Sequence, residues 1–463
     1  MTESAGDRPR VLIIVQNLPV PLDRRVWLEA TTLTRAGYLV SVICPKAEGF
    51  DASYEVIEDI HVYRYRVPVQ AQGLVGFVAE FIWCFFRTLM KLLRVCVAGR
   101  GFDVLHACNP PETFWPLAYL IRPFGKRFIF DHHDLSPELY LAKFDRPVRL
   151  VHSTLLFLER MTFRAADVVI TTNESYKRIA MERGGVEAND VFIVRSGPDV
   201  DRLSTYEPDP SWRRGKRHML TYLGEMCKQD GVDHLVRALR VMRDDLGRND
   251  IHCVFVGGGP HQQTIEAYAH ELGVADMCTF TGRVSDEMMS RILSSADVGV
   301  DPDPKNDFND KCTMNKIMEY LFFGLPVVCY DLAEHRVSAG PAALYVEPNR
   351  EVALAAGIVT LLEDAERRQE MGRTGQERFR SMLAWDHSAP RLLAAYERVV
   401  PRGQYRGAEQ RPRHENAPSN RVGPRFQRNP EGRKCGDVRG RRKQDLSAST
   451  STATPERASR LGR

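Results

Sequence analysis

Short, fully apolar runs alternate with amphipathic stretches along most of the chain. The first run covers residues 11–15, a helical pattern follows over 26–36, and the next run covers 40–44. Runs that are apolar at every position are typical of parallel strands buried on both faces. A strand, a helix and a strand in this order indicate a βαβ unit. We therefore predict that the chain begins with a doubly wound α/β sheet.

The same alternation continues after one interruption. Residues 199–217 are rich in proline and charged residues, as in a linker between domains. A chain of 463 residues also exceeds the size of one typical domain. We therefore predict two doubly wound domains. The predicted division is an N-terminal tail at 1–9, a first domain at 10–199, a second domain at 200–384, a closing helix at 385–401 and a disordered basic tail at 402–463.

The strongest chemical signal lies in the second half, in a stretch that reads as a loop, a short helix and a buried strand. Thr313 is placed to cap the helix, Gly324 to end it, and residues 327–329 to begin the strand. Lys316 and Glu319 are three residues apart and share one helix face. Free backbone N–H groups at a helix N-terminus favour a phosphate. A nucleotide would use Lys316 for its diphosphate and Glu319 for its ribose; the alternative is a surface ion pair.

This stretch resembles the signature of the retaining glycosyltransferases of family 4. The signature has two Glu residues separated by seven positions, then Gly-x-Pro-Val-Val. Glu319 and residues 324–328 match its second half, whereas Lys311 stands at the first Glu position. A branch of the family with Asn-Lys-x-x-Glu-Tyr is similar to residues 315–320. The resemblance implies a GT-B fold, in which two Rossmann-like domains face each other across a cleft, and a nucleotide-sugar donor, which we expect to be UDP-linked.

The resemblance also assigns further residues and shows two departures. The family places an Arg and a Lys beside the diphosphate, but Glu225 and Asp230 stand at those positions, and Lys228 between them is the expected substitute. A Gly-Gly pair of the family is replaced by residues 19–25. Because of these departures, Lys316 is the main cation that we expect at the leaving group. The implied donor-binding residues are Thr313, Met314 and Asn315 at the helix start, Gly258 and Gly259 in a glycine turn, Arg283 and Val284 beside the base, and Glu319.

Polar residues follow two predicted strands of the first half. His106 lies near the end of one strand, and His132, His133 and Asp134 follow another. Ligands of open α/β sheets bind beyond the carboxyl ends of the strands. The segment resembles the family's strand-end His-Asp, which lies beside the donor sugar and the acceptor; we assign this role to His133, with His132 as its rival. Zinc is a weaker alternative, because no spacing for a third ligand is evident.

An Asp-x-Asp pair at residues 301–303 is a candidate site for Mg²⁺ on a nucleotide sugar. Prolines follow both aspartates, so we interpret the segment as a turn instead. We therefore expect no metal and no cofactor.

Residues 74–98 predict a long helix rich in apolar and aromatic residues. Arg87, Lys91 and Arg94 form one basic stripe along it. Contact with an anionic membrane is one interpretation. The alternative, which we favour here, is a core helix with a solvated basic face. No apolar run approaches the roughly 20 residues that span a bilayer.

Charge and cysteine content indicate the kind of partner and the cellular location of the protein. Residues 402–463 contain 16 Lys+Arg and 6 Asp+Glu, a charge of +10, so the net +4 of the chain leaves −6 for the rest. We therefore expect a solvating basic tail and no specific nucleic acid partner. The ten cysteines include no C-x-x-C motif, which indicates reduced thiols. Together with a charged N-terminus unlike a signal peptide, this predicts a cytoplasmic protein. The membrane interpretation of residues 74–98 would add peripheral contact at the inner face of the cell membrane.

These features predict an enzyme that transfers a sugar, with retention and without a metal, to a glycan or lipid-linked acceptor in surface or exopolysaccharide biosynthesis. One alternative is a nucleotide-sugar epimerase of the same architecture. The other is a non-catalytic scaffold derived from a transferase, which the missing Arg/Lys pair favours.

Overall fold

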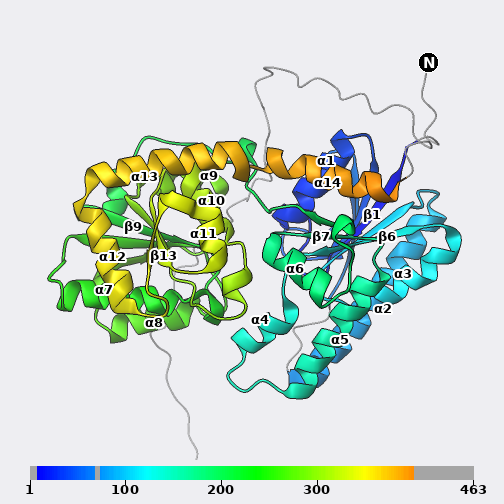
Figure 1. Cartoon of the computed structure of the whole chain (residues 1–463), viewed down its shortest axis with the longest axis horizontal. Helices are drawn as coiled ribbons and strands as arrows, with labels where there is room; N and C mark the ends of the chain where they lie inside the picture. The colour runs from blue at the N-terminus through cyan, green and yellow to red at the C-terminus, as the bar shows by residue number, and fades with distance from the viewer. Residues whose placement is uncertain (1–7, 68–72, 401–463) are drawn as a thin grey trace, which may run out of the picture. The chain divides into compact units, whose positions relative to one another are not determined.

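The computed structural model describes residues 8–67 and 73–400. The predicted basic tail lies outside the described residues, so its properties stay predictions. Within the described residues the chain forms two separate sheets (Figure 1). Both sheets have helices on their two faces, which confirms the expected pair of doubly wound, Rossmann-like domains of a GT-B fold.

The first sheet has eight strands in the order β3-β4-β2-β1-β5-β6-β7-β8, and only the β3–β4 pair is antiparallel. The hairpin β3–β4 was not predicted, because β3 is short and lies at the edge, with side chains too exposed to give an apolar run. The strands are β1 (Arg10–Ile14), β2 (Leu39–Pro45), β3 (Tyr54–Ile57), β4 (Ile60–Tyr65), β5 (Val104–Cys108), β6 (Arg127–His132), β7 (Val168–Thr171) and β8 (Val191–Ile193).

Helices cover both faces of this sheet because successive strand residues point to opposite sides. Val11 and Ile13 of β1 pack in one core, and Leu12 and Ile14 pack in the other. All four side chains are buried, as the continuous apolar run predicts. The helices of this half are α1 (Arg24–Arg35), α2 (Gly73–Val97), α3 (Trp115–Ile121), α4 (Ser136–Lys143), α5 (Arg149–Ala165) and α6 (Glu174–Glu182).

The second sheet has six parallel strands in the order β11-β10-β9-β12-β13-β14. They are β9 (His218–Leu223), β10 (Ile251–Val256), β11 (Cys278–Phe280), β12 (Val298–Asp301), β13 (Val327–Tyr330) and β14 (Ala343–Val346). The helices are α7 (Val232–Asp244), α8 (Gln262–Glu271), α9 (Asp286–Ser295), α10 (Asn315–Phe322), α11 (Ala333–Ala339), α12 (Glu351–Glu363) and α13 (Ala365–Arg378).

The last described helix, α14 (Trp385–Val399), packs on the first sheet rather than on the second. Trp385 and Tyr396 lie in the same core as β1, and α14 runs beside α1 in Figure 1. The indole Nε1 of Trp385 donates to Thr32 Oγ1 at 2.9 Å. The C-terminal helix thus returns to the first half of the chain.

The helix α2 packs in a core through Cys84, Leu92 and Val95, as the favoured interpretation predicts, but its basic stripe is solvated only in part. Arg94 is exposed. Lys91 is buried and its Nζ donates to the carbonyl of Ser53 at 3.3 Å, whereas the exposed side chains include Trp83, Phe86 and Leu93. A lysine can be buried in this way because its long stem is apolar while its ammonium still reaches a hydrogen-bond acceptor. Among the described residues, no helix is both long and apolar enough to cross a bilayer.

Candidate functional site

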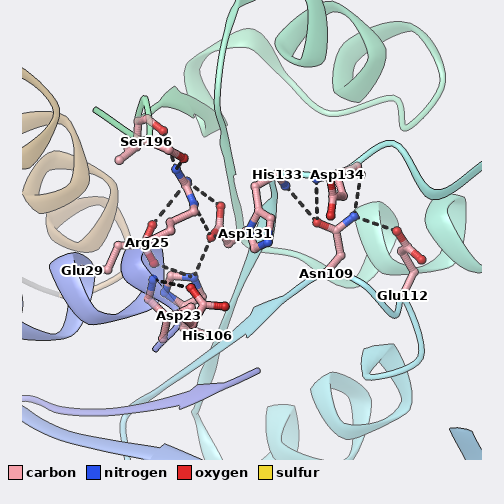
Figure 2. Close-up of polar contacts among 12 residues, drawn as sticks. Asp23, Arg25, Glu29, His106, Asn109, Glu112, Asp131, His133, Asp134 and Ser196 are labelled. Atoms are coloured by element: carbon pink, nitrogen blue, oxygen red, sulfur yellow. Dashed lines mark hydrogen bonds and ion pairs between the residues drawn. The ribbon is translucent and has the colours of Figure 1, made fainter. Parts of the chain in front are cut away.

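The predicted site residue His133 lies directly after β6, at the carboxyl end of the first sheet. Its Nδ1 donates to Asp131 Oδ2 at 3.0 Å, and its side chain is 15% exposed. Asp131 is the penultimate residue of β6 and is fully buried. Figure 2 shows Asp131 between Arg25 and His133. The strand therefore brings a buried carboxylate beneath the ring of a histidine that reaches the surface.

Arg25 neutralises the buried Asp131. Its Nε and Nη2 donate to the two carboxylate oxygens of Asp131 at 2.9 and 2.7 Å, in a bidentate pair. Its Nη1 donates to the Val194 carbonyl at 2.8 Å and to Ser196 Oγ at 2.9 Å. Arg25 thus links the start of α1 to the segment that follows β8. Buried ion pairs of this kind need such additional hydrogen bonds, because removing both charges from water is costly.

Asn109 fixes the backbone on the other side of His133 (Figure 2). Its Oδ1 accepts hydrogen bonds from the backbone N–H groups of His133 at 2.8 Å and Asp134 at 3.1 Å. Its Nδ2 donates to Glu112 Oε1 at 2.7 Å and to the Asp134 carbonyl at 2.6 Å. The position of His133 is therefore set by side chains from two neighbouring strand ends.

The charges around His133 shift its protonation equilibrium. Burial disfavours the charged imidazolium, but the charge and hydrogen bond of Asp131 outweigh this and raise the pKa of His133 to about 9. Burial also disfavours ionisation of Asp131, yet Arg25 and His133 hold the pKa of this carboxyl well below its usual range. Burial and the neighbouring charge of Asp131 raise the pKa of Glu29 to about 7. At neutral pH His133 is therefore a cation.

The rival histidines lie deeper. His132 is fully buried, with Nε2 3.2 Å from Glu159 Oε1 and its ring 4.9 Å from that of Phe163. His106 is also fully buried, and its Nδ1 lies 2.7 Å from the Tyr396 hydroxyl of α14. Of the strand-end histidines, His133 is the one whose ring reaches the surface.

Four ligand-type side chains of this region lie close enough to hold a metal ion. Their ligand atoms lie within 4.8 Å of one another: Glu29, His106, Cys108 and Asp131. However, Arg25 Nη2 lies 3.2 Å from Glu29 and 2.7 Å from Asp131. A guanidinium inside the cluster already balances the carboxylates and would repel a dication. We therefore propose no metal there.

The start of α10 in the second half differs from the prediction in one respect. The helix begins at Asn315 with Met314 at its N-cap position and no side-chain cap, so the predicted cap by Thr313 is wrong. Thr313 Oγ1 instead accepts a hydrogen bond from Asn173 Nδ2 at 3.0 Å. Gly324 has a positive φ of 69° and ends the helix as predicted.

Lys316 lies in a buried cluster of charges. Its Nζ donates to Asp303 Oδ1 at 2.6 Å and lies 3.3 Å from Asp301 Oδ1. Asp301 ends β12, and its Oδ1 accepts a hydrogen bond from the backbone N–H of Asp303 at 3.3 Å, as in the turn that we predicted. Both carboxylates are also buried against the lysine. The sequence could not show this, because it needs the end of β12 to meet α10 in space.

Ionisation in this cluster is strongly coupled to the lysine. Burial opposes the charged form of Lys316, but Asp301 and Asp303 raise its pKa well above the usual range. Burial and the neighbouring Asp301 raise the pKa of Asp303 well above its usual range. Burial also raises the pKa of Asp230 to about 6. The charge of Lys316 is already shared by two carboxylates, and its role toward a diphosphate stays a prediction.

Glu319 is held by two arginines that the sequence did not single out. Its Oε1 accepts from Arg202 Nη2 at 2.6 Å and from Arg24 Nη1 at 3.4 Å. Both arginines also contact Asp286 Oδ1, at 2.7 and 2.8 Å. The sequence feature that could have identified Arg24 is the pair of arginines in residues 19–25, the segment that replaces the family's glycines. The surface ion pair between Lys316 and Glu319 that we weighed is wrong, because each has other partners.

The remaining predicted residues fall into two groups. Lys228 is half-exposed and pairs with Asp145 of the first half, so the structure does not place it beside Lys316. The glycine turn does lie beside the predicted base-binding segment, because the N–H of Gly257 donates to the Gly282 carbonyl at 3.1 Å. A Cβ at Gly258 would lie 3.6 Å from the backbone nitrogen of Arg283. Val284 packs at the edge of the adjoining core.

Family models match both halves of the chain. Residues 22–197 match a glycosyl transferase 4-like domain, and residues 217–364 match the glycosyl transferases group 1. Over 236 residues the chain is 29% identical to a GDP-mannose-dependent alpha-(1-6)-phosphatidylinositol monomannoside mannosyltransferase of Mycobacterium tuberculosis. The match covers 48% of this chain and 60% of the length of that relative.

Solved structures share the fold. The sucrose-phosphate synthase of Thermosynechococcus elongatus superposes with a TM-score of 0.65 at 18% identity, over 85% of this chain and 99% of that one. A protein of Anabaena in complex with UDP and glucose superposes with a TM-score of 0.63 at 15% identity, over 84% of this chain and all of that one. At such low identity these likenesses show the fold alone.

Proposed function

Because the chain belongs to the family 4 type of glycosyltransferases, we propose that it transfers a sugar from a nucleotide-sugar donor to a glycan or lipid-linked acceptor, with retention, in surface polysaccharide synthesis. The observation that carries the proposal is His133, a cationic imidazole held at the strand-end edge of the first sheet. Glu319 in α10 supplies the second recognition group, a carboxylate suited to ribose hydroxyls.

The donor side must stabilise a leaving diphosphate. The first turn of α10 offers backbone N–H groups that no side chain caps, which suits a phosphate. Arg24 and Arg202, which pair with Glu319, are further cations of this region, whereas the family's Arg and Lys positions hold Glu225 and Asp230. Preorganised donors of this kind act on charge as it develops during bond cleavage. We assign the donor diphosphate to this region, with Lys316 as a supporting cation.

We also propose that transfer needs no divalent metal. The Asp301 and Asp303 carboxylates, which would be the natural Mg²⁺ ligands, are paired with Lys316. A bound dication would have to displace the lysine from both carboxylates. Activity that disappears in EDTA and returns with Mg²⁺ or Mn²⁺ would contradict this.

Contact with an anionic membrane surface would bring the enzyme to a lipid-linked acceptor. Of the twenty-four large apolar side chains exposed among the described residues, fourteen lie between Ile82 and Phe157. Several of these exposed apolar side chains lie on α2, and Arg94 is exposed among them. The guanidinium carbon of Arg87 lies 5.7 Å from the centre of the Trp83 ring. Apolar and aromatic side chains flanked by arginines are typical of interfacial helices. We therefore propose peripheral binding through α2 at the inner face of the cell membrane.

Vesicle flotation tests the membrane proposal. Phe86→Glu with Leu93→Glu should abolish binding to vesicles that contain phosphatidylglycerol, because both side chains are exposed on α2. Val352→Glu, at an exposed apolar position of α12, is the matched control and should bind as wild type. Equal binding of all variants would contradict the proposal.

A thermal-shift screen of nucleotide sugars tests the donor assignment. We propose a UDP-linked sugar; GDP-linked sugars form the second arm, because the mycobacterial relative is GDP-mannose-dependent. A ligand at 100 times its dissociation constant adds roughly 2.7 kcal/mol to the free energy of unfolding. Incubation of the selected donor with and without acceptor lipids then separates the alternatives. Sugar on the acceptor supports transfer, an altered sugar from donor alone indicates an epimerase, and binding without turnover indicates a scaffold.

A further inference from the structure

The buried pair of Arg25 and Asp131 has no role in the assignments above, although it lies directly behind His133. Asp131 is fully buried and makes three contacts shorter than 3.1 Å, two with Arg25 and one with His133 Nδ1. Two charged side chains in the core are costly unless each is fully paired. Replacing a buried ion pair by well-packed apolar side chains is often neutral or stabilising, so fold stability alone does not account for this pair.

The geometry gives the pair a directional effect on His133. Nδ1 is committed to Asp131, which fixes both the plane of the ring and the nitrogen that carries this proton. Within residues 8–67 and 73–400, the other nitrogen, Nε2, makes no hydrogen bond, and the ring is the part of the network that reaches the surface. A ring held through Nδ1 presents Nε2–H outward as a donor.

Other charged groups also face His133, so Asp131 has to be weighed against them. Asp134 follows it in the chain, Asp23 caps α1 and Glu29 lies within this helix. The charge of Arg25 opposes these carboxylates. Of the carboxylates, Asp131 is the one that hydrogen-bonds the ring. Arg25 in turn holds Asp131 in place through its bonds to Val194 and Ser196.

We propose that Asp131 is the positioning carboxylate of His133, and that Arg25 holds it so that the imidazolium Nε2–H donates a hydrogen bond to an oxygen of the bound donor sugar or its diphosphate. The identity of the substrate in this proposal rests on the proposed function, whereas the protonation state of the His133 ring does not. His133 then acts as a fixed cation and hydrogen-bond donor, not as a general base, because the proton stays on the ring through neutral pH.

The first test is a titration of the histidine rings of the wild-type protein by nitrogen NMR. The His133→Gln variant identifies the His133 resonance, because that signal is missing from its spectrum. The substitution leaves both side chains of the buried Arg25–Asp131 pair in the protein. The result expected is a ring protonated on both nitrogens that titrates near pH 9. A His133 ring that titrates at or below 6.5 would overturn the proposal, whether or not a substrate has been found.

The second test is kinetic. Asp131→Asn should lower kcat by about 10- to 100-fold, with the KM for the donor changed less than about threefold, and should move the alkaline limb of the kcat profile from near 9 toward 6.5. The matched control is Asp297→Asn, which breaks another bidentate pair, with Arg213 in the second half. It should alter stability but not the pH profile.

The two tests separate the possible failures. If Asp131→Asn does not fold, the wild-type titration still decides the state of the ring. If Asp131→Asn folds and its pH profile is that of wild type, Asp131 is structural and the proposal is wrong. If no nucleotide sugar is turned over but His133 titrates near 9, the proposed function fails while the positioning stands.

Discussion

At the scale of single residues, the sequence identified His133 and Glu319 better than the charges that hold them. His133 follows a strand and Glu319 lies within the short helix α10, where sequence patterns place them. Their partners Arg25, Asp131 and Arg202 come from distant parts of the chain or were not recognised as partners. A charged residue in a loop and one in the core look the same in a sequence. Only the meeting of strand ends shows which charges compensate each other.

Glu319→Ala should weaken nucleotide binding by about 10-fold or more, because it removes the acceptor proposed for the ribose hydroxyls. Calorimetric titration with the nucleoside diphosphate measures this. Glu347→Ala, an exposed glutamate paired with Arg350 in the same half of the chain, is the control and should bind as wild type. Unchanged affinity in Glu319→Ala would refute the ribose role.

The raised pKa of His133 predicts a stability that depends on pH. Folding raises the pKa from 6.5 to about 9, so the folded state binds the proton more tightly than the unfolded state. The contribution is fully present below about pH 6.5 and is lost as the pH rises through 9. It amounts to about 3 kcal/mol at most. Urea unfolding at pH 6 and pH 10 should show this loss in wild type and not in His133→Gln; parallel losses would contradict the assignment.

At the scale of elements, the apolar runs predicted most strands and helices because parallel strands buried on both faces give an unambiguous pattern. The end of α10 was also predictable, since Gly324 adopts a left-handed conformation there. The edge hairpin β3–β4 and the cap of α10 were missed. The short strand β3 is too exposed to give an apolar run, and the cap of α10 depends on a bond to Thr313 from the distant Asn173.

Tyr320 ties α10 to the second sheet and gives a prediction at this scale. Its hydroxyl accepts from the Leu223 N–H at 2.8 Å and donates to the Val300 carbonyl at 3.2 Å, and all three groups are buried. Tyr320→Phe leaves a buried N–H unpaired and should lower the free energy of unfolding by about 1–3 kcal/mol. Tyr206→Phe is the control, since the Tyr206 ring lies under the exposed guanidinium of Arg291. Equal stability of the two variants would show that the bond to α10 contributes nothing.

At the scale of the whole molecule, the order of the apolar runs and helical stretches predicted two doubly wound domains. The two sheets confirm this prediction. The return of α14 to the first sheet was implied only by the family resemblance, because no local pattern says which core a helix joins. Burial of Trp385, Leu392 and Tyr396 makes this helix part of the first core.

A truncation after Arg402 should therefore leave the melting temperature within about 3 °C of wild type, because the removed composition cannot form a core. A truncation after Ala384 is the contrasting variant. It removes α14 and should unfold the first half of the chain. If the variant truncated after Arg402 fails to fold, or fails to transfer sugar to a soluble acceptor, the prediction that the tail is dispensable is wrong.

The central claim is that this chain moves a sugar from a nucleotide to an acceptor. The most direct measurement is the transfer of labelled sugar from the donor selected in the thermal screen to extracted lipid acceptors, followed by mass spectrometry. The account predicts a product one sugar heavier in the presence of EDTA, formed on the order of 100-fold more slowly by His133→Gln. Donor binding without any labelled product, or equal rates for wild type and His133→Gln, would contradict it.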